Sequence, residues 1–206
     1  MPGTKNFYDT IRPALFNGAL STAQVNGIEA ILTCCADAAI TDQREVAYIL
    51  ATIYHECDRT MQPIEESGKG ARYDYGKQLK RGGGPGKRIP YLTPKQLYYG
   101  RGYVQLTWYE NYEAQGKLLG LDLLNHPELV LQPAIAAKVL THGMTHGDFT
   151  GHRLAEYFTP QLTDFVNARK IINGLDCAER IAGYAGIFLK ALTGPAASAE
   201  HDPPTA

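Results

Sequence analysis

The chain has 206 residues, a formal net charge of −1 and a hydrophobic content of 44%, as is typical of one globular domain. No apolar run approaches the roughly 20 residues of a membrane-spanning helix, and the first residues lack the apolar core of a secretory signal. We therefore expect a monomer made in the cytoplasm, with one domain over residues 1–192. Residues 193–206 are rich in Ala and Pro, which favours a disordered tail.

The cysteines and the charge pattern exclude some sites and suggest one surface. The four cysteines, Cys34, Cys35, Cys57 and Cys177, lack the spacing of metal ligands, so we interpret them as reduced, buried thiols and expect neither a metal nor a cofactor. From Lys69 to Arg101 there are nine basic residues and one acidic residue. Such a stretch suits contact with a polyanionic surface, although a solvated loop without a partner fits as well. We expect no nucleic-acid partner.

Apolar residues at helical spacing predict a mainly α fold. The predicted helices cover residues 7–16, 22–35, 44–59, 108–119, 132–143, 162–173 and 177–192. The third has the strongest start signal, because Asp42 as N-cap and Glu45 three residues later form a capping-box pattern. Between residues 60 and 97, glycine and proline interrupt the periodicity, which predicts a loop-rich or short β insert.

Glu56 lies near the end of the third predicted helix, at the margin of its apolar stripe and beside Ile49. A sheltered carboxyl has its charged form disfavoured, so we expect its pKa to rise above about 4.3, towards the range of a general acid. A glycosidase needs a second, ionised carboxylate across the scissile bond. Glu65 and Glu66 follow on the loop that leaves the helix, although simple solvation of either is the alternative.

Residues 98–108 combine aromatic, cationic, amide and hydroxyl side chains with two glycines. Alternation along an extended chain would send Tyr103, Gln105 and Thr107 to one side. One interpretation is a half-buried strand with a solvated polar face. The other is a sugar site, in which the Thr107 hydroxyl orients a water molecule and Gln105 binds a sugar amide or hydroxyl. Tyr98, Tyr99, Tyr103 and Trp108 would offer flat faces to a sugar ring, and ordinary core packing is the alternative, above all for Trp108 and Tyr103.

These segments together resemble glycoside hydrolase family 19, a chitinase family, and in particular its bacteriophage endolysin branch. The resemblance rests on Tyr54-His55-Glu56, on residues 99–107, on Asn111-Tyr112, on Gly143-Met144 through Phe149-Thr150-Gly151, and on Ala168-Arg169 through Ile172-Asn173-Gly174. It covers roughly residues 46–192. It implies a lysozyme-like α+β superfold, in which two helical lobes enclose a glycan cleft.

The resemblance also implies roles for individual residues. Glu56 matches the general acid of the family, and Thr107 matches the hydroxyl residue that positions the attacking water. Gln105, Asn111 and Asn173 match positions that line or support the substrate cleft. Tyr99, Arg101 and Tyr103 are further candidates for substrate binding, although Arg101 could instead pair structurally with a buried acid.

The second carboxylate is where the chain departs from plant-type chitinases, because the region around residues 78–81 has no acid. Members of the endolysin branch resemble this chain in having a nearer acid, which Glu65 matches. Glu66 and Asp74 remain alternatives.

The reaction implied is hydrolysis of the β-1,4 bond between N-acetylmuramic acid and N-acetylglucosamine in peptidoglycan, which lyses the host cell wall. The protein would act in the periplasm after its release from the cytoplasm, and the basic stretch 69–101 would contact an anionic envelope surface. Three alternatives stay open: a chitinase, a lytic transglycosylase and a glycan-binding protein without turnover.

Overall fold

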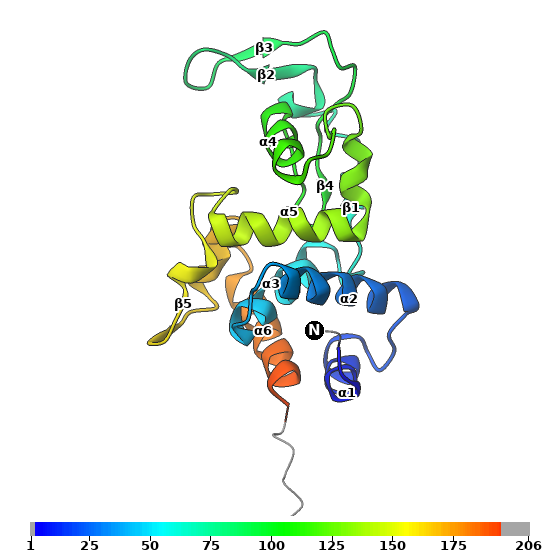
Figure 1. Cartoon of the computed structure of the whole chain (residues 1–206), viewed down its shortest axis with the longest axis vertical. Coiled ribbons are helices and arrows are strands. Elements are labelled where there is room, and N and C mark those ends of the chain that lie inside the picture. The colour runs from blue at the N-terminus through cyan, green and yellow to red at the C-terminus, as the bar shows by residue number, and fades with distance from the viewer. Residues whose placement is uncertain (1–2, 195–206) are drawn as a thin grey trace, which may run out of the picture.

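The computed structural model describes residues 3–194, so the tail predicted from residue 193 onward falls almost entirely outside the described residues. This part of the chain is mainly α-helical (Figure 1). Its α-helices are α1 (Lys5–Leu15), α2 (Thr22–Asp37), α3 (Gln43–Glu56), α4 (Tyr109–Leu119), α5 (Pro133–His146) and α6 (Ala178–Thr193). The one-turn 3₁₀ helices are η1 (Asp74–Gly76), η2 (Pro127–Leu131), η3 (Leu154–Glu156) and η4 (Asn167–Ile171).

The strands are very short and form three two-stranded antiparallel ribbons. They are β1 (Ile64–Glu65), β2 (Leu79–Arg81), β3 (Arg88–Pro90), β4 (Arg101–Gly102), β5 (Phe158–Thr159) and β6 (Leu162–Thr163). β1 pairs with β4, β2 with β3 and β5 with β6. The loop-rich insert predicted between residues 60 and 97 is therefore present, with the β2–β3 hairpin inside it.

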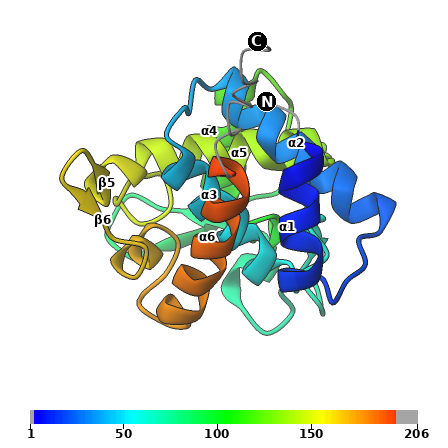
Figure 2. The ribbon, with the colours of Figure 1, turned by 90° about the horizontal axis from the view of Figure 1, so that it is seen from below.

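The largest hydrophobic cluster lies among α1, α2, α3 and α6, which we call the helical body (Figure 2). α3 is its central helix and packs against α6. Every residue from Val46 to Tyr54 is buried, so α3 is enclosed on all sides and not only along one stripe. Glu56 is its last residue and emerges from this core at the helix terminus.

The start of α3 differs in detail from the predicted capping box. The Asp42 carboxylate accepts from the backbone N–H of Arg44 at 2.8 Å, as an N-cap should. The same carboxylate accepts from the Arg44 guanidinium at 2.5 Å, and in the described part of the chain the Glu45 side chain does not complete the box by accepting from the Asp42 backbone N–H. Arg44 in turn donates to the carbonyl oxygen of Thr159, which fastens the β5–β6 ribbon to the helix start.

A second, smaller hydrophobic cluster is the core of a part of the molecule that we call the upper lobe. This lobe contains β2, β3, α4 and η2 (Figure 1). α5 runs between the two clusters (Figure 1). Its residue Val139 belongs to the upper cluster, whereas Ala137 and Leu140 belong to the core of the helical body. α5 is therefore the element that both lobes share.

The prediction of a helix over residues 162–173 is wrong. β6 and the one-turn helix η4 occupy this range instead. The Asp164 carboxylate accepts hydrogen bonds from the backbone N–H and the side-chain amide of Asn167, at 2.9 and 2.8 Å. A bond from the N–H three residues on is of the helix-capping type, so the helical turn follows Asp164, while Leu162 and Thr163 before it pair in the β5–β6 ribbon.

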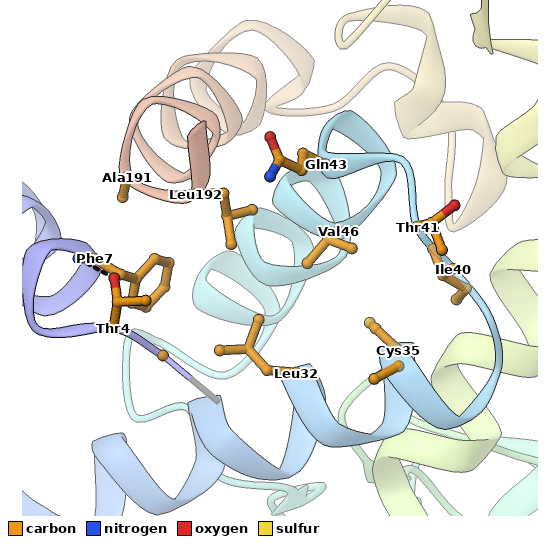
Figure 3. Close-up of a pocket in the computed structure, with 12 residues that line it drawn as sticks. Thr4, Phe7, Leu32, Cys35, Ile40, Thr41, Gln43, Val46, Ala191 and Leu192 are labelled. Carbon is orange, nitrogen blue, oxygen red and sulfur yellow. Dashed lines mark hydrogen bonds between the residues drawn. The ribbon is translucent and has the colours of Figure 1, made fainter. Parts of the chain in front are cut away.

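An apolar cavity of about 280 Å³ lies within the helical body, between α1, α2, α3 and α6 (Figure 3). Its lining includes Phe7, Leu32, Cys35 and Val46, and none of the lining residues is charged. It therefore lacks the acid–base groups of a hydrolytic site. Within residues 3–194, no helix has the length and apolar content to cross a membrane.

Candidate active site

The end of α3 places Glu56 beside an arginine that is distant in the sequence. Nη1 of Arg169, on η4, donates to Oε1 of Glu56 at 2.5 Å. The Arg169 side chain is 4% exposed and that of Glu56 is 21% exposed, so the half-sheltered position predicted for Glu56 is confirmed. Among the described residues, no group forms a hydrogen bond with Oε2 of Glu56. Arg169 therefore holds Oε1 of Glu56, and Oε2 is available to another partner.

Residues 101–107 form a tight turn, and not the alternating strand that the sequence suggested. Arg101 and Leu106 exchange backbone hydrogen bonds of 3.3 and 2.9 Å, which closes the turn between them. Gln105 adopts a left-handed conformation, with a φ of 53°. As a result Tyr103 and Leu106 point into the interior, while Gln105 and Thr107 line a groove.

β1 places Glu65 directly opposite Arg101 on β4. The Tyr99 hydroxyl donates to Oε1 of Glu65 at 2.5 Å, and Nε of Arg101 lies 3.4 Å from the same oxygen. The hydrogen bond from Tyr99 and the nearby positive charges, of Lys69 and Arg101, hold the pKa of Glu65 below its usual range. Glu65 is therefore an ionised, solvent-exposed carboxylate at neutral pH.

Three residues predicted to contact substrate are instead buried, and two of them, Tyr99 and Arg101, hold the Glu65 carboxylate. Tyr99, Arg101 and Tyr103 are only 5%, 6% and 1% exposed. The Arg101 guanidinium stacks on the Tyr99 ring at 3.6 Å and donates to the Tyr112 hydroxyl. Because these side chains lie beneath the surface, they cannot present a flat or charged face to a sugar. Arg101 does pair with an acid, as in the alternative interpretation, but this acid, Glu65, is exposed and not buried.

The other two candidate carboxylates have structural partners. Both oxygens of Glu66 accept hydrogen bonds, one from the Tyr75 hydroxyl at 2.9 Å and one from the Gly100 N–H at 3.0 Å. Asp74 is exposed and pairs with Lys77 at 2.7 Å. Glu65 pairs with Arg101 at the first residue of the turn, and the Gln105 amide donates to the carbonyl of its neighbour Ile64.

Gly100 allows the turn to pack against the loop that carries both glutamates. A Cβ atom at this position would lie 2.6 Å from Oε1 of Gln105 and 3.2 Å from Oε2 of Glu66. Any side chain would therefore push these two groups apart. The glycine that stood out in the sequence is required for this close approach.

A groove of about 510 Å³ runs along the turn, between α4 and the end of α5. Thr107, Gln105 and Asn111 line it, together with Ile172 from the segment after η4. Asn173 follows Ile172 and is exposed, and its N–H donates to the carbonyl of Arg169, the partner of Glu56. At the other end, the Cys57 thiol contacts the Tyr103 carbonyl at 3.7 Å. These contacts connect the end of α3 to the turn and to the segment after η4, although Glu56 and Glu65 themselves are not among the residues that line the groove.

Comparison with known proteins decides the family. The family model of glycoside hydrolase family 19, chitinase class I, matches residues 7–148. This chain belongs to that family. An endochitinase of Arabidopsis thaliana is 39% identical over 97 residues, which are 46% of this chain and 29% of that protein. An inactive chitinase-like protein of Hevea brasiliensis is 34% identical over 93 residues, 44% of this chain and 29% of that protein.

The fold of this family 19 chain agrees with that of a solved relative along nearly its whole length. Chitinase C from Streptomyces griseus matches with a TM-score of 0.59 and 23% identity, over 95% of this chain and 79% of that one. The mainly α, lysozyme-like fold predicted from the sequence is therefore confirmed. By contrast, the sequence matches span less than a third of the length of the two curated relatives.

Proposed function

We propose that this family 19 protein is an endolysin-type glycoside hydrolase, which cuts the β-1,4 bond between N-acetylmuramic acid and N-acetylglucosamine in peptidoglycan. The observation that carries the proposal is the contrast between two carboxyl groups. Glu65 is solvent-exposed and kept ionised by Tyr99 and Arg101, whereas Glu56 is half-sheltered at the end of α3, with one oxygen paired to Arg169 and the other available. Two carboxyls in unlike surroundings suit a general base and a general acid.

In the proposed mechanism, Glu56 donates a proton to the leaving oxygen. Because Arg169 occupies Oε1, the proton is carried on Oε2. Glu65 accepts a proton from a water molecule that the Thr107 hydroxyl orients, and this water attacks the anomeric carbon from the opposite face. The product anomer is then inverted, as in enzymes whose two carboxyl groups stand about 6.5–9.5 Å apart.

The groove supplies polar groups for the sugars on either side of this bond. Gln105 and Asn111 line it, and Asn173 is exposed next to it. Their amides can both donate to and accept from hydroxyl and N-acetyl groups. The Gln105 amide nitrogen already donates to the Ile64 carbonyl, and its oxygen packs beside Gly100, so we expect the Gln105 side chain to turn when it binds a sugar.

Chitin is the second candidate substrate, because the relatives of this chain are named chitinases. The two polymers share the linkage and the N-acetyl group. The position of Glu65 supports peptidoglycan as the substrate, because an acid on the loop after α3 matches the pattern of the endolysin branch. The test compares initial rates on purified peptidoglycan and on an N-acetylglucosamine hexamer. Faster turnover of the hexamer would overturn the assignment of peptidoglycan, and not chitin, as the substrate.

Mass spectrometry of the released fragments tests the mechanism. We expect Glu56→Gln to lower turnover by about 10²–10⁴-fold and Glu65→Gln to lower it strongly as well. Undiminished activity of Glu56→Gln would refute the assignment of the acid, and near-normal activity of Glu65→Gln would redirect the search to Glu66 or Asp74. An anhydro sugar end would identify a lytic transglycosylase. No turnover by the wild type would indicate a glycan-binding protein, as the inactive relative suggests.

The remaining parts of the proposal concern place and partners. The protein would be made in the cytoplasm of the bacterial host and act as a monomer on the wall after release. The basic residues between Lys69 and Arg101 would then contact an anionic surface of the envelope. The exposure of several of these cations on the upper lobe supports this contact.

A further inference from the structure

A cluster of three polar side chains occupies the wall of the groove opposite the turn. Gln115 comes from α4, His142 from α5 and Asp148 from the residues that follow α5. All three line the same groove as Thr107. Nδ1 of His142 lies 2.8 Å from Oδ2 of Asp148, and the amide of Gln115 donates to this same oxygen at 3.0 Å. None of the three belongs to the acid–base machinery proposed above.

The contacts determine which atoms remain for a ligand. A carboxylate oxygen only accepts, so Nδ1 of His142 carries the hydrogen, and in this tautomer Nε2 is the acceptor of the ring. Within residues 3–194, neither Nε2 of His142 nor Oδ1 of Asp148 has a hydrogen-bond partner. The two side chains are 29% and 30% exposed. The cluster therefore presents two acceptors, one of them negatively charged, to the groove.

The cluster is held in place at some cost to the protein. Gln115 is 5% exposed, and in the described part of the chain its Oε1 is buried without a hydrogen-bond partner. Rotating the amide by half a turn would exchange its oxygen and nitrogen and bring the oxygen to the Asp148 carboxylate. The amide nitrogen can therefore donate to Asp148 only while Oε1 stays unpaired. An unpaired buried carbonyl costs about 1–3 kcal/mol. A simple link between α4 and α5 requires no such arrangement and no exposed imidazole.

The backbone around Asp148 is also tightly packed. Its N–H donates to the carbonyl of Gly143 at 3.1 Å. A Cβ atom on Gly143 would lie 2.1 Å from the ring of Phe149, so this ring packs directly on the helix backbone. The acceptor pair therefore has a fixed position on the groove wall.

From this arrangement we propose that His142 and Asp148 form a subsite for an unsubstituted N-acetylglucosamine unit. The hydroxyl and amide hydrogens of that unit would donate to Nε2 and Oδ1. An N-acetylmuramic acid unit replaces one hydroxyl by a lactyl ether that leads to peptide carboxylates, and Asp148 repels these. Because peptidoglycan alternates the two sugars, the subsite sets which of the two linkages reaches Glu56.

This inference rests on the proposed function, since it assumes that a glycan strand lies in the groove. Its first test identifies the reducing ends released from peptidoglycan after borohydride reduction. We expect only reduced muramic acid from the wild type and a mixture with reduced glucosamine from Asp148→Asn. A single type of end from Asp148→Asn would overturn the subsite.

His142→Gln supplies a second variant that keeps the cluster together. The Gln amide can still donate to Asp148, but the ring acceptor is lost. We expect KM for the polymer to rise by about fivefold to tenfold with little change in kcat, as for one lost hydrogen bond. A merely structural role predicts equal losses in both constants. Glu113→Gln is the matched control, because Glu113 lies on α4, pairs with Lys117 and does not line the groove.

A third measurement separates failure of the subsite from failure of the proposed substrate. If the wild type releases nothing from peptidoglycan, the polymer was misassigned. The subsite is then tested on chitin and on carboxymethyl chitin, which carries the anionic substituents that Asp148 should reject. We expect Asp148→Asn to raise the relative turnover of the carboxymethyl polymer by about fivefold, as for one removed like-charge contact. An unchanged ratio would overturn the subsite.

Discussion

Arg169 determines which substitutions at Glu56 the fold can tolerate. The guanidinium is almost fully buried, and its hydrogen bond to Glu56 crosses 113 residues of sequence. We expect Glu56→Gln to stay folded, because an amide oxygen can still accept from Arg169. Glu56→Ala leaves the buried cation without that acceptor and should lower the free energy of unfolding by about 2 kcal/mol relative to Glu56→Gln. Urea denaturation measures the difference, and equal stabilities would contradict this account.

The pH dependence of activity is set in part by the Tyr99 hydroxyl. Its hydrogen bond keeps the pKa of Glu65 low, and Glu65 must be ionised to act as a base. Activity therefore falls as the pH drops through this pKa. In Tyr99→Phe the pKa rises, so the acidic limb of the pH–rate profile should move to higher pH.

Tyr98→Phe is the matched control for this prediction. This substitution removes a neighbouring hydroxyl that donates to the carbonyl of Leu124 and to neither Glu56 nor Glu65. Its profile should coincide with that of the wild type. A shift in both variants, or in neither, would show that Tyr99 does not act through Glu65.

At the scale of elements, Gly143 permits the close packing that positions the wall of the groove. In Gly143→Ala the new methyl group would collide with Phe149, so we expect a loss of about 1–3 kcal/mol of stability. Gly183 on α6 has open space around its Cβ position. Gly183→Ala should therefore stabilise the protein by about 0.5–1 kcal/mol, through helix propensity alone. Thermal unfolding of the two variants should shift in opposite directions.

Much of the helical framework could be predicted, because most helices bury apolar residues at regular spacing. The ends of the helices were harder to predict. The third helix was predicted to reach residue 59, but Asp58 and Arg59 adopt positive φ values and end it at Glu56. The turn at Gln105 was missed for the same reason, since glutamine carries no signal for a left-handed backbone.

The candidate site was predictable where a residue's role follows from its own chemistry or from a motif. Glu56, Glu65 and Thr107 were predicted in this way, and their catalytic roles stay predictions. The interior positions of Tyr99 and Tyr103 could not be predicted, because an aromatic residue suits both a core and a sugar platform. The contacts of Arg169 with Glu56 and of Gln115 with Asp148 join residues that are 113 and 33 positions apart, and no local spacing encodes them.

At the scale of the whole molecule, the basic stretch is less uniform than its composition suggested. Arg101 is buried, and Arg81 and Arg88 both pair with Glu110 on α4. Other cations in the stretch, including Arg72, Lys87 and Lys95, are exposed. The β2–β3 hairpin carries part of this charge at the end of the molecule away from α1 and α6 (Figure 1).

The exposed cations of the upper lobe should mediate binding to an anionic envelope surface. Replacing Arg72, Lys87 and Lys95 with Gln should weaken binding to phosphatidylglycerol vesicles by about a hundredfold at low salt, at about 1 kcal/mol per cation. The same change at Lys138, Arg180 and Lys190 is the control, because these exposed cations lie outside the stretch. Equal binding by both triple variants would remove the proposed contact.

Because α5 contributes to both hydrophobic clusters, neither lobe can lose its core without exposing part of the other. The two lobes should therefore unfold as one cooperative unit. Trp108 is the chain's single tryptophan and lies at the start of α4, so its fluorescence reports on the upper lobe, whereas far-UV circular dichroism reports mainly on the helical body. The two signals should follow one urea transition with the same midpoint. Two separate midpoints would mean that the walls of the groove are stabilised independently.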